Sequence, residues 1–232
     1  MPPAGQTPGD DAVAIGSDEA GKGPVLGPMV AAAVRAPPDV IPDEVDDSKR
    51  LSPATREKIA ETLRAREDVA VGVAVVPTDR IDAPETDMNS LTVAAHAEAI
   101  AAVARDGDAV TTDAGDVSES RFARRVREGV AAGPAGPTVD VHAEHGADAE
   151  YPLVAAASVI AKVRRDAAIE SLAAEYADYG PIGSGYPSDQ TTRAFLRDFV
   201  AETGDLPDCA RASWSTSADV LAAAEQSGLS EF

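Results

Sequence analysis

The sequence of 232 residues contains one cysteine, Cys209. A single cysteine excludes an internal disulfide framework and any zinc site built from several thiolates. No apolar run is long enough to cross a bilayer, and residues 1–11 lack the basic start and apolar stretch of a signal peptide. We therefore expect a cytoplasmic protein without a membrane span.

Aromatic and basic residues are also scarce. Aromatic residues make up 4% of the chain, so the core must be built mainly from Ala, Val, Leu and Ile. Lys and Arg number 20 against 40 Asp and Glu, a net charge of −20, whereas a nucleic-acid partner normally calls for a basic face. The acids are spread along the whole chain, which also fits a protein in concentrated salt, where the Debye length falls to about 3 Å at 1 M. We adopt the hypothesis that the charge reflects a halophilic habitat.

Short apolar runs alternate with helical patterns along the chain, an order typical of a mixed α/β layer fold. Ser52 and Ser118 are expected to be helix N-caps. In this prediction residues 1–11 are a flexible N-terminus, residues 12–205 form one α/β domain, and residues 206–232 form a C-terminal helical segment. The predicted strands are 12–18, 29–35, 69–76, 109–113 and 138–144, and the predicted helices are 53–66, 90–105, 118–130, 152–176, 189–203 and 216–226.

The stretch IGSDEAGKGPVLGP allows two interpretations. Gly16, Gly21 and Lys22 have the G-x-x-x-x-G-K spacing of a P-loop, which cradles phosphate. That motif needs Ser or Thr directly after the lysine, where Gly23 stands, and a following helix, which Pro24 interrupts. Acidic side chains inside the loop would also repel phosphate. We therefore disfavour a P-loop nucleotide hydrolase.

The second interpretation is a metal site built from acids. Asp18 and Glu19 are neighbours, and neighbours on a regular strand point to opposite faces, so we expect the strand to end here, where glycines let the backbone turn. By itself such a pair also fits a solvated surface. However, Asp113 ends the strand AVTTD, and Asp148 lies shortly before a long helix. Four such carboxylates repel one another unless cations neutralise them, and oxygen ligands favour Mg²⁺ or Mn²⁺.

Two further groups of polar residues are not assigned to the active site by the sequence. His142, His145 and Asp148 have a spacing that can bind zinc, but in an extended segment the two histidines would point to opposite faces. This disfavours a zinc site. Asp166 is best explained by an i, i+4 ion pair with Lys162 on a helix, and it is left outside the catalytic set.

Five blocks of the sequence resemble type 2 ribonuclease H, ribonuclease HII, and its archaeal branch most of all. They are GSDEAGKGPVLGPMV, DSKRLSPATRE, TTDAGDV, HGADAEYPLVAAASVIAKVRRD and GSGYPSD, and the resemblance runs from about Val13 to Trp214. It implies a ribonuclease H-like mixed sheet flanked by helices, with a C-terminal helical extension. It also implies an endonuclease that hydrolyses the RNA strand of RNA–DNA hybrids. Such an enzyme also cuts 5′ of ribonucleotides embedded in DNA, for ribonucleotide excision in DNA replication and repair.

The family's four catalytic acids correspond to Asp18, Glu19, Asp113 and Asp148. The resemblance implies that they bind two divalent ions, Mg²⁺ or Mn²⁺, one of which activates the attacking water while the other stabilises the leaving 3′ oxygen. The expected products carry 5′-phosphate and 3′-hydroxyl ends. The expected partners are RNA–DNA hybrids and duplex DNA that contains ribonucleotides.

The family's Gly-Arg-Gly loop corresponds to Gly21, Lys22 and Gly23. The resemblance implies that the backbone of this loop contacts the ribose 2′-hydroxyl, the group that separates RNA from DNA. Lysine keeps the charge of the usual arginine but loses its planar, bidentate fork. We therefore expect a weaker or differently shaped grip on the scissile region.

Three further residues match substrate-binding positions of the family. Tyr186 in GSGYPSD is expected to stack on the nucleotide at the RNA–DNA junction, with a half-buried tyrosine that anchors a glycine turn as the alternative. Ser48 and Lys49 match residues near the substrate backbone. We expect a monomer, and the sequence shows no recognisable docking peptide after Glu225.

Overall fold

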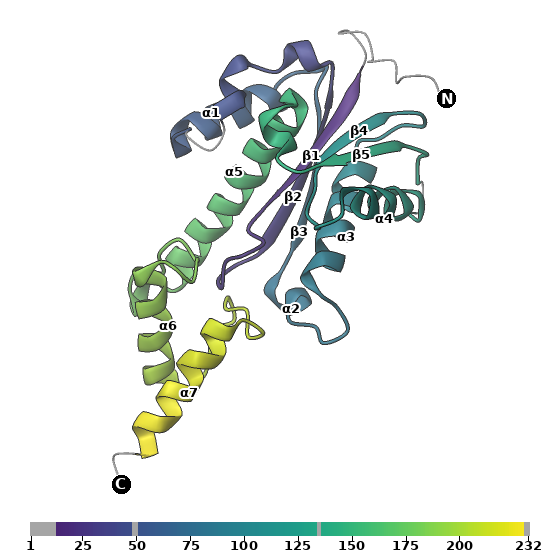
Figure 1. Cartoon of the computed structure of the whole chain (residues 1–232). Helices are drawn as coiled ribbons and strands as arrows, with labels where there is room; N and C mark the ends of the chain where they lie inside the picture. The colour runs from purple at the N-terminus through teal and green to yellow at the C-terminus, as the bar shows by residue number, and fades with distance from the viewer. Residues whose placement is uncertain (1–12, 48–50, 134–135, 230–232) are drawn as a thin grey trace. The chain divides into compact units, whose positions relative to one another are not determined.

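The computed structural model describes residues 13–47, 51–133 and 136–229, which form a mixed sheet flanked by helices (Figure 1). The sheet of this described part has five strands in the order β3-β2-β1-β4-β5, which confirms the predicted fold class. β1 pairs with β4 in parallel, and β4 pairs with β5 in parallel. The strands are β1 (Ala14–Ala20), β2 (Met29–Ala36), β3 (Ala70–Val76), β4 (Ala109–Asp113) and β5 (Asp140–Glu144).

The helices follow the predicted order, and their N-caps explain several of their starts. The Ser52 side chain accepts a hydrogen bond from Thr55 N over 3.2 Å, and the Ser118 side chain accepts one from Arg121 N over 3.4 Å. Among the α-helices of the described residues, only the short α2 was missed, because four residues are too few to show a helical period. The helices are α1 (Pro53–Arg64), α2 (Thr78–Ile81), α3 (Met88–Ala101), α4 (Glu119–Ala131), α5 (Pro152–Glu175), α6 (Gln190–Thr203) and α7 (Ser215–Leu229).

β1 ends at Ala20, one residue past the pair of acids, and the chain turns at Gly21 with a φ of 84°, so a glycine ends the strand as expected but both acids still lie within it. The strand continues past them, and successive side chains therefore point to opposite faces of the sheet. Gly16 and Asp18 share the face on which α5 packs, where a Cβ on Gly16 would overlap the backbone of Leu153. Ser17 and Glu19 share the other face, on which α3 packs. The two neighbouring acids are thus held from different sides.

The described chain separates into two compact units. The first unit consists of the chain up to Glu19 together with Ala31–Ala74 and Thr92–Val163. Its core is built from small aliphatic side chains, as the scarcity of aromatic residues predicts. On α5, for example, Ala156, Val159 and Ile160 are all fully buried.

The second unit consists of Ala20–Val30, Val75–Leu91 and the chain from Arg164 onward. Its core contains a group of aromatic rings, in which Tyr176 lies 5.8 Å from both Phe195 and Phe199 between ring centroids. Cys209 is buried in the same core. Across the described ranges, none of the helices combines the length and the hydrophobicity that a bilayer span requires.

Candidate active site

Three segments of the first unit bring acidic side chains to one edge of the sheet. β1 and β4 are parallel and pair through Ser17 and Thr112, so Asp18 and Asp113 follow at neighbouring positions on adjacent strands. Asp148 lies in a short 3₁₀ turn that follows β5, the parallel neighbour of β4. Parallel strands end at the same edge, where α/β proteins place their ligand sites. The structure thus brings the predicted acids together.

The buried carboxyl of Asp18 resists ionisation. Its residue is 6% exposed, and burial, followed by repulsion from Glu19, raises its pKa to about 7. The charge of Asp113 adds to this effect, while the Ser158 hydroxyl on α5 hydrogen-bonds the carboxyl and acts in the opposite direction. A cation at this position would relieve the repulsion and favour the ionised form.

The loop between β5 and α5 holds the carboxylate of Asp113. The backbone N–H groups of Gly146 and Ala147 donate to Asp113 Oδ1 over 2.7 and 3.0 Å. These bonds favour the ionised form, but burial is the larger effect and raises the pKa of Asp113, and the charges of Glu19 and Asp148 act in the same direction. Gly146 has a φ of 74°, a conformation that glycine adopts without strain.

His96 on α3, which the sequence analysis did not single out, contacts the same cluster. Its residue is fully buried, and its Nε2 lies 2.9 Å from Glu19 Oε2. Its Nδ1 lies 2.9 Å from the hydroxyl oxygens of Ser17 and of Thr112. The signal in the sequence was a lone polar ring within the otherwise apolar helical stretch LTVAAHA.

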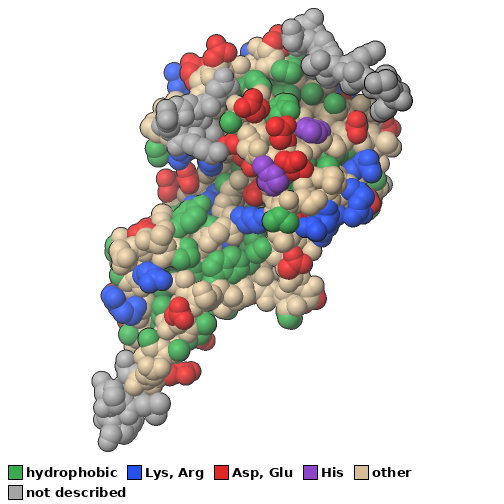
Figure 2. Space-filling model, viewed as in Figure 1, with side chains coloured by type: hydrophobic (Ala, Val, Ile, Leu, Met, Phe, Trp, Pro, Cys, Tyr) green, Lys and Arg blue, Asp and Glu red, His purple; other side chains and the backbone are tan. Residues whose placement is uncertain are grey.

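Figure 2 shows histidine side chains among acidic ones on one face of the molecule. The side chains of His142 and His145 are both exposed. His142 Nε2 lies 3.3 Å from Glu144 Oε2. The His145 ring bonds the Glu119 carboxylate and the Asp116 carbonyl oxygen, each over 2.8 Å. Both ring nitrogens of His145 therefore face acceptors, and these hydrogen bonds raise its pKa. The two histidines thus contact different residues.

The four carboxylates are suitable ligands for a hard divalent cation. Their side chains do not converge on a single point. Within the described residues, no three His, Cys, Asp or Glu side chains are arranged to hold a metal ion. Burial, and after it the charge of neighbouring acids, raises the pKa values of Asp18 and Asp113, and a bound cation would offset that charge. Mg²⁺ and Mn²⁺ prefer carboxylate oxygens.

In the second unit, two residues from the last part of the chain fix the loop formed by Gly21, Lys22 and Gly23. The buried guanidinium of Arg211 donates to the carbonyl oxygens of Gly21 and Lys22 over 2.6 and 2.9 Å. Trp214 Nε1 donates to the carbonyl oxygen of Gly23 over 3.2 Å. Burial lowers the pKa of Arg211 to about 10, so the side chain remains charged at neutral pH. The loop backbone is therefore held in one conformation.

Tyr186, also in the second unit, presents a ring that is partly open to solvent. The residue is 41% exposed, and the guanidinium carbon of Arg165 lies 5.1 Å from the ring centroid. Arg165 Nη2 donates to the carbonyl oxygen of Ser184 over 2.8 Å and so anchors the glycine turn. The contact with Arg165 and the exposed part of the ring fit the two roles considered for Tyr186, an anchor and a stacking surface.

Three remaining predictions about single residues are not decided by these contacts. Ser48 and Lys49 lie outside the described residues, so their positions near substrate stay predictions. Lys162 donates to Ser158 Oγ over 2.8 Å, and its ion pair with Asp166 stays a prediction as well.

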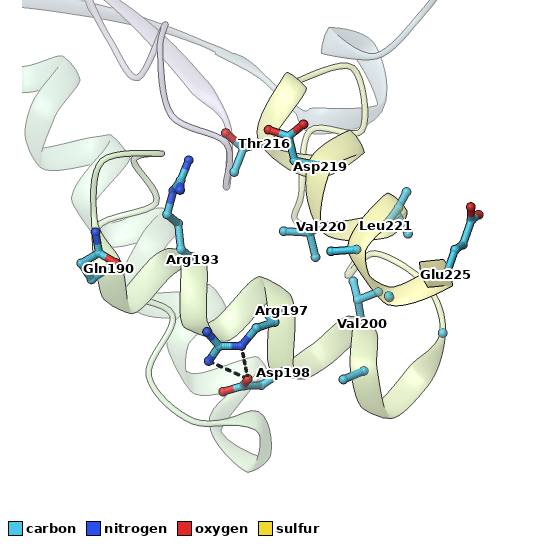
Figure 3. A pocket seen from close by; sticks show the side chains of 14 residues that line it. Gln190, Arg193, Arg197, Asp198, Val200, Thr216, Asp219, Val220, Leu221 and Glu225 are labelled. Atoms are coloured by element: carbon cyan, nitrogen blue, oxygen red, sulfur yellow. Dashed lines mark hydrogen bonds and ion pairs between the residues drawn. The ribbon is translucent and has the colours of Figure 1, made fainter. Parts of the chain in front are cut away.

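A pocket of about 920 Å³ lies between α6 and α7 in the second unit (Figure 3). Its walls combine apolar side chains such as Val200 and Val220 with charged ones. Arg197 points along the wall and pairs with Asp198 over 2.9 Å. None of the residues predicted for the active site lines this pocket, so we assign it no part in catalysis.

The family model for ribonuclease HII matches residues 15–217. The chain belongs to the ribonuclease HII family. Members of this family cleave the RNA of RNA–DNA hybrids, and the chain is accordingly a ribonuclease H enzyme. Ribonuclease HII of Halobacterium salinarum is 61% identical over 219 residues, which cover 94% of this chain and 99% of that protein. This relative supports the halophilic, archaeal origin that charge and motifs indicated.

Two solved structures of ribonuclease HII type share the fold. The ribonuclease H2 of Pyrococcus horikoshii OT3 superposes with a TM-score of 0.79 at 33% identity, covering 93% of this chain and all of that chain (100%). The ribonuclease HII in the PCNA:RNase HII complex from Archaeoglobus fulgidus gives a TM-score of 0.76 at 37% identity, with 88% and 95% coverage. These similarities confirm the ribonuclease H-like fold predicted from the motifs.

Proposed function

We propose that this member of the family acts both on RNA–DNA hybrids and on duplex DNA with an embedded ribonucleotide, which it cuts on the 5′ side. The proposed products carry 5′-phosphate and 3′-hydroxyl ends. One observation supports the proposal: Asp18, Glu19 and Asp113 lie on two adjacent parallel strands, and Asp148 lies in the turn that follows β5. Such a cluster suits a reaction at phosphorus only when cations offset its charge.

We propose that the same four carboxylates hold two divalent ions, Mg²⁺ or Mn²⁺. When bound, such ions activate water and stabilise the charge that develops on phosphorus and on the leaving oxygen. The chain supplies the ligands and fixes them. The N–H groups of Gly146 and Ala147 orient Asp113, and burial of Asp18 keeps water away from one side of the cluster.

For substrate recognition, we propose that the backbone of Gly21, Lys22 and Gly23 contacts the ribose 2′-hydroxyl. Support comes from Arg211, which occupies the carbonyl oxygens of Gly21 and Lys22 and thereby fixes the orientation of the loop's peptide groups. We further propose that Tyr186 stacks on the nucleotide at the RNA–DNA junction. The partial exposure of its ring supports this role.

The test is a cleavage map on a DNA duplex that carries one ribonucleotide, in concentrated KCl with Mg²⁺, Mn²⁺ or EDTA. We expect one cut on the 5′ side of the ribonucleotide with either ion, and no cut with EDTA or in all-DNA duplex. Asp113→Asn should lose cleavage, whereas Asp140→Asn, at an exposed acid on β5, should retain it. Cleavage in EDTA, or fragments with 3′-phosphate ends, would contradict the proposal.

We also propose PCNA, the partner named for the Archaeoglobus relative, as a candidate partner of this chain. Gel filtration with a halophilic archaeal PCNA should show co-elution, and separate elution of the two proteins would contradict the proposal. The same gel filtration, run on the chain alone, tests the expected monomer. The cytoplasmic location stays a prediction.

A further inference from the structure

The histidine on α3 is fully buried, although its ring carries two polar nitrogens. His96 is fully inaccessible, and the ring of Phe122 on α4 packs edge-on against it, with centroids 5.2 Å apart and planes at 84°. Burying a polar ring costs free energy unless its nitrogens find hydrogen-bond partners. The partners of His96 therefore indicate what keeps it there.

All of these partners lie on the strands that carry the acids. Nε2 is 2.9 Å from Glu19 Oε2, and because a carboxylate only accepts, Nε2 is the donor. Nδ1 is 2.9 Å from the hydroxyl oxygens of Ser17 on β1 and Thr112 on β4. The Ser17 hydroxyl also donates to the carbonyl oxygen of Ala32 over 2.8 Å. The Thr112 hydroxyl donates to the carbonyl oxygen of Asp113 over 3.1 Å. The ring is thus oriented from both strands, whether or not Nδ1 carries a proton.

Glu19 needs such support more than its neighbour does. Because β1 continues past both acids, Asp18 faces α5 while Glu19 faces α3. The carboxylate of Glu19 must therefore reach the shared cluster from the opposite side of the sheet. A long side chain loses rotamer freedom when it is held in one direction, and a fixed hydrogen bond offsets that cost.

We infer that His96 is a positioning residue that holds one oxygen of Glu19 and so orients this carboxylate as a ligand for a divalent ion. The inference rests on the proposed function of the four acids. Hydrogen-bond partners behind metal ligands are worth about 10- to 100-fold in metal affinity or activity. His96 acts through Glu19 and touches neither substrate nor the reacting atoms.

The test compares Mn²⁺ affinity, measured by calorimetry without substrate, for wild type and three variants of the full chain. His96→Leu should weaken Mn²⁺ binding by about 10- to 100-fold. His96→Gln, whose amide can still donate to Glu19, should recover most of that affinity. Phe122→Leu, the matched control, removes packing against the same ring and should lower the melting temperature while leaving the Mn²⁺ dissociation constant unchanged.

Kinetics provide a second readout that a purely structural role would not produce. In hybrid cleavage, His96→Leu should need more Mn²⁺ for half-maximal rate, with the KM for hybrid unchanged at saturating ion. If His96→Leu does not fold, His96→Met keeps an apolar side chain of adaptable shape without a donor and answers the same question.

Two outcomes would overturn the inference: a folded His96→Leu variant that binds Mn²⁺ as wild type does, or an equal loss of affinity in Phe122→Leu. Failure of the proposed function looks different. In that case wild type itself would not cleave hybrid, and Asp113→Asn would not change Mn²⁺ binding. A double variant with Glu19→Gln adds a further check, because the effect of His96→Leu should vanish once Glu19 can no longer act as an anionic ligand.

Discussion

The substitution Asp18→Asn should stabilise the metal-free protein at pH 8 while it removes cleavage. The pKa of Asp18 is raised from 3.8 to about 7, first by burial and then by repulsion from Glu19. The folded protein therefore binds this proton more tightly than the unfolded chain does. Between these two values the free energy of unfolding falls as pH rises, and above about pH 7 the full penalty applies.

The size of the effect follows from the two pKa values. At about 1.4 kcal/mol for each pH unit, ionised Asp18 costs the folded state at most about 4 kcal/mol above pH 7. Part of that cost is already present at pH 5, because an unfolded-state carboxyl is mostly ionised there. Between pH 5 and pH 8 the wild type should therefore lose about 2–3 kcal/mol that Asp18→Asn does not lose.

Urea denaturation in EDTA at constant KCl, at pH 5 and pH 8, measures this difference. Asp116→Asn is the matched control, because hydrogen bonds from Arg121 lower the pKa of Asp116 to about 2. The stability that Asp116 contributes is complete above its unfolded pKa and is lost only as pH falls through about 2. Its variant should be equally destabilised at both pH values. If wild type and Asp18→Asn responded to pH in parallel, the pKa of Asp18 would not be raised in the folded protein and the reasoning would be refuted.

Four further substitutions test the site. Asp113→Asn should lower the hybrid cleavage rate by at least about 100-fold in a steady-state assay, with an unchanged circular dichroism spectrum, because it removes a metal ligand. Lys22→Arg should preserve or raise kcat/KM, and a large loss would show that the loop is built around lysine. Arg211→Met should lower the urea-unfolding free energy by about 2–4 kcal/mol, because it leaves buried carbonyl oxygens without donors. Gly21→Ala should raise the KM for hybrid, since its φ is 84° and a Cβ would lie 2.8 Å from the carbonyl oxygen of Pro28.

The fold was largely predictable because its signals are local. β4 was predicted with both of its bounds, and the starts of α1 and α4 followed from Ser52 and Ser118, whose side chains bond backbone N–H groups three residues on. The prediction failed where the local signal was ambiguous. The glycines after Glu19 suggested that β1 ends at the acids, but the strand uses the next residue as well and turns only at Gly21.

The sequence singled out the four acids but not the side chains and loops that contact them. Asp113 could be found because it closes an apolar strand, a pattern visible within five residues. The pairing of His96 with Glu19 could not be found, because the two residues lie 77 positions apart in the sequence. Arg211 is separated from Gly21 by 190 positions, and nothing near either residue indicates the pairing. Contacts of this kind are set by the packing of distant elements, which a single sequence does not display.

The net charge of −20 and a polyanionic substrate are compatible because salt limits how far charge acts. At about 1 M salt the Debye length is about 3 Å, so acids elsewhere on the surface barely repel an approaching duplex. Only groups in direct contact then matter, and the ones proposed are the four carboxylates with their divalent ions, the loop fixed by Arg211 and the ring of Tyr186. Composition therefore reports the solvent to which the surface is adapted. The reaction is determined by a few side chains whose placement outweighs the average charge.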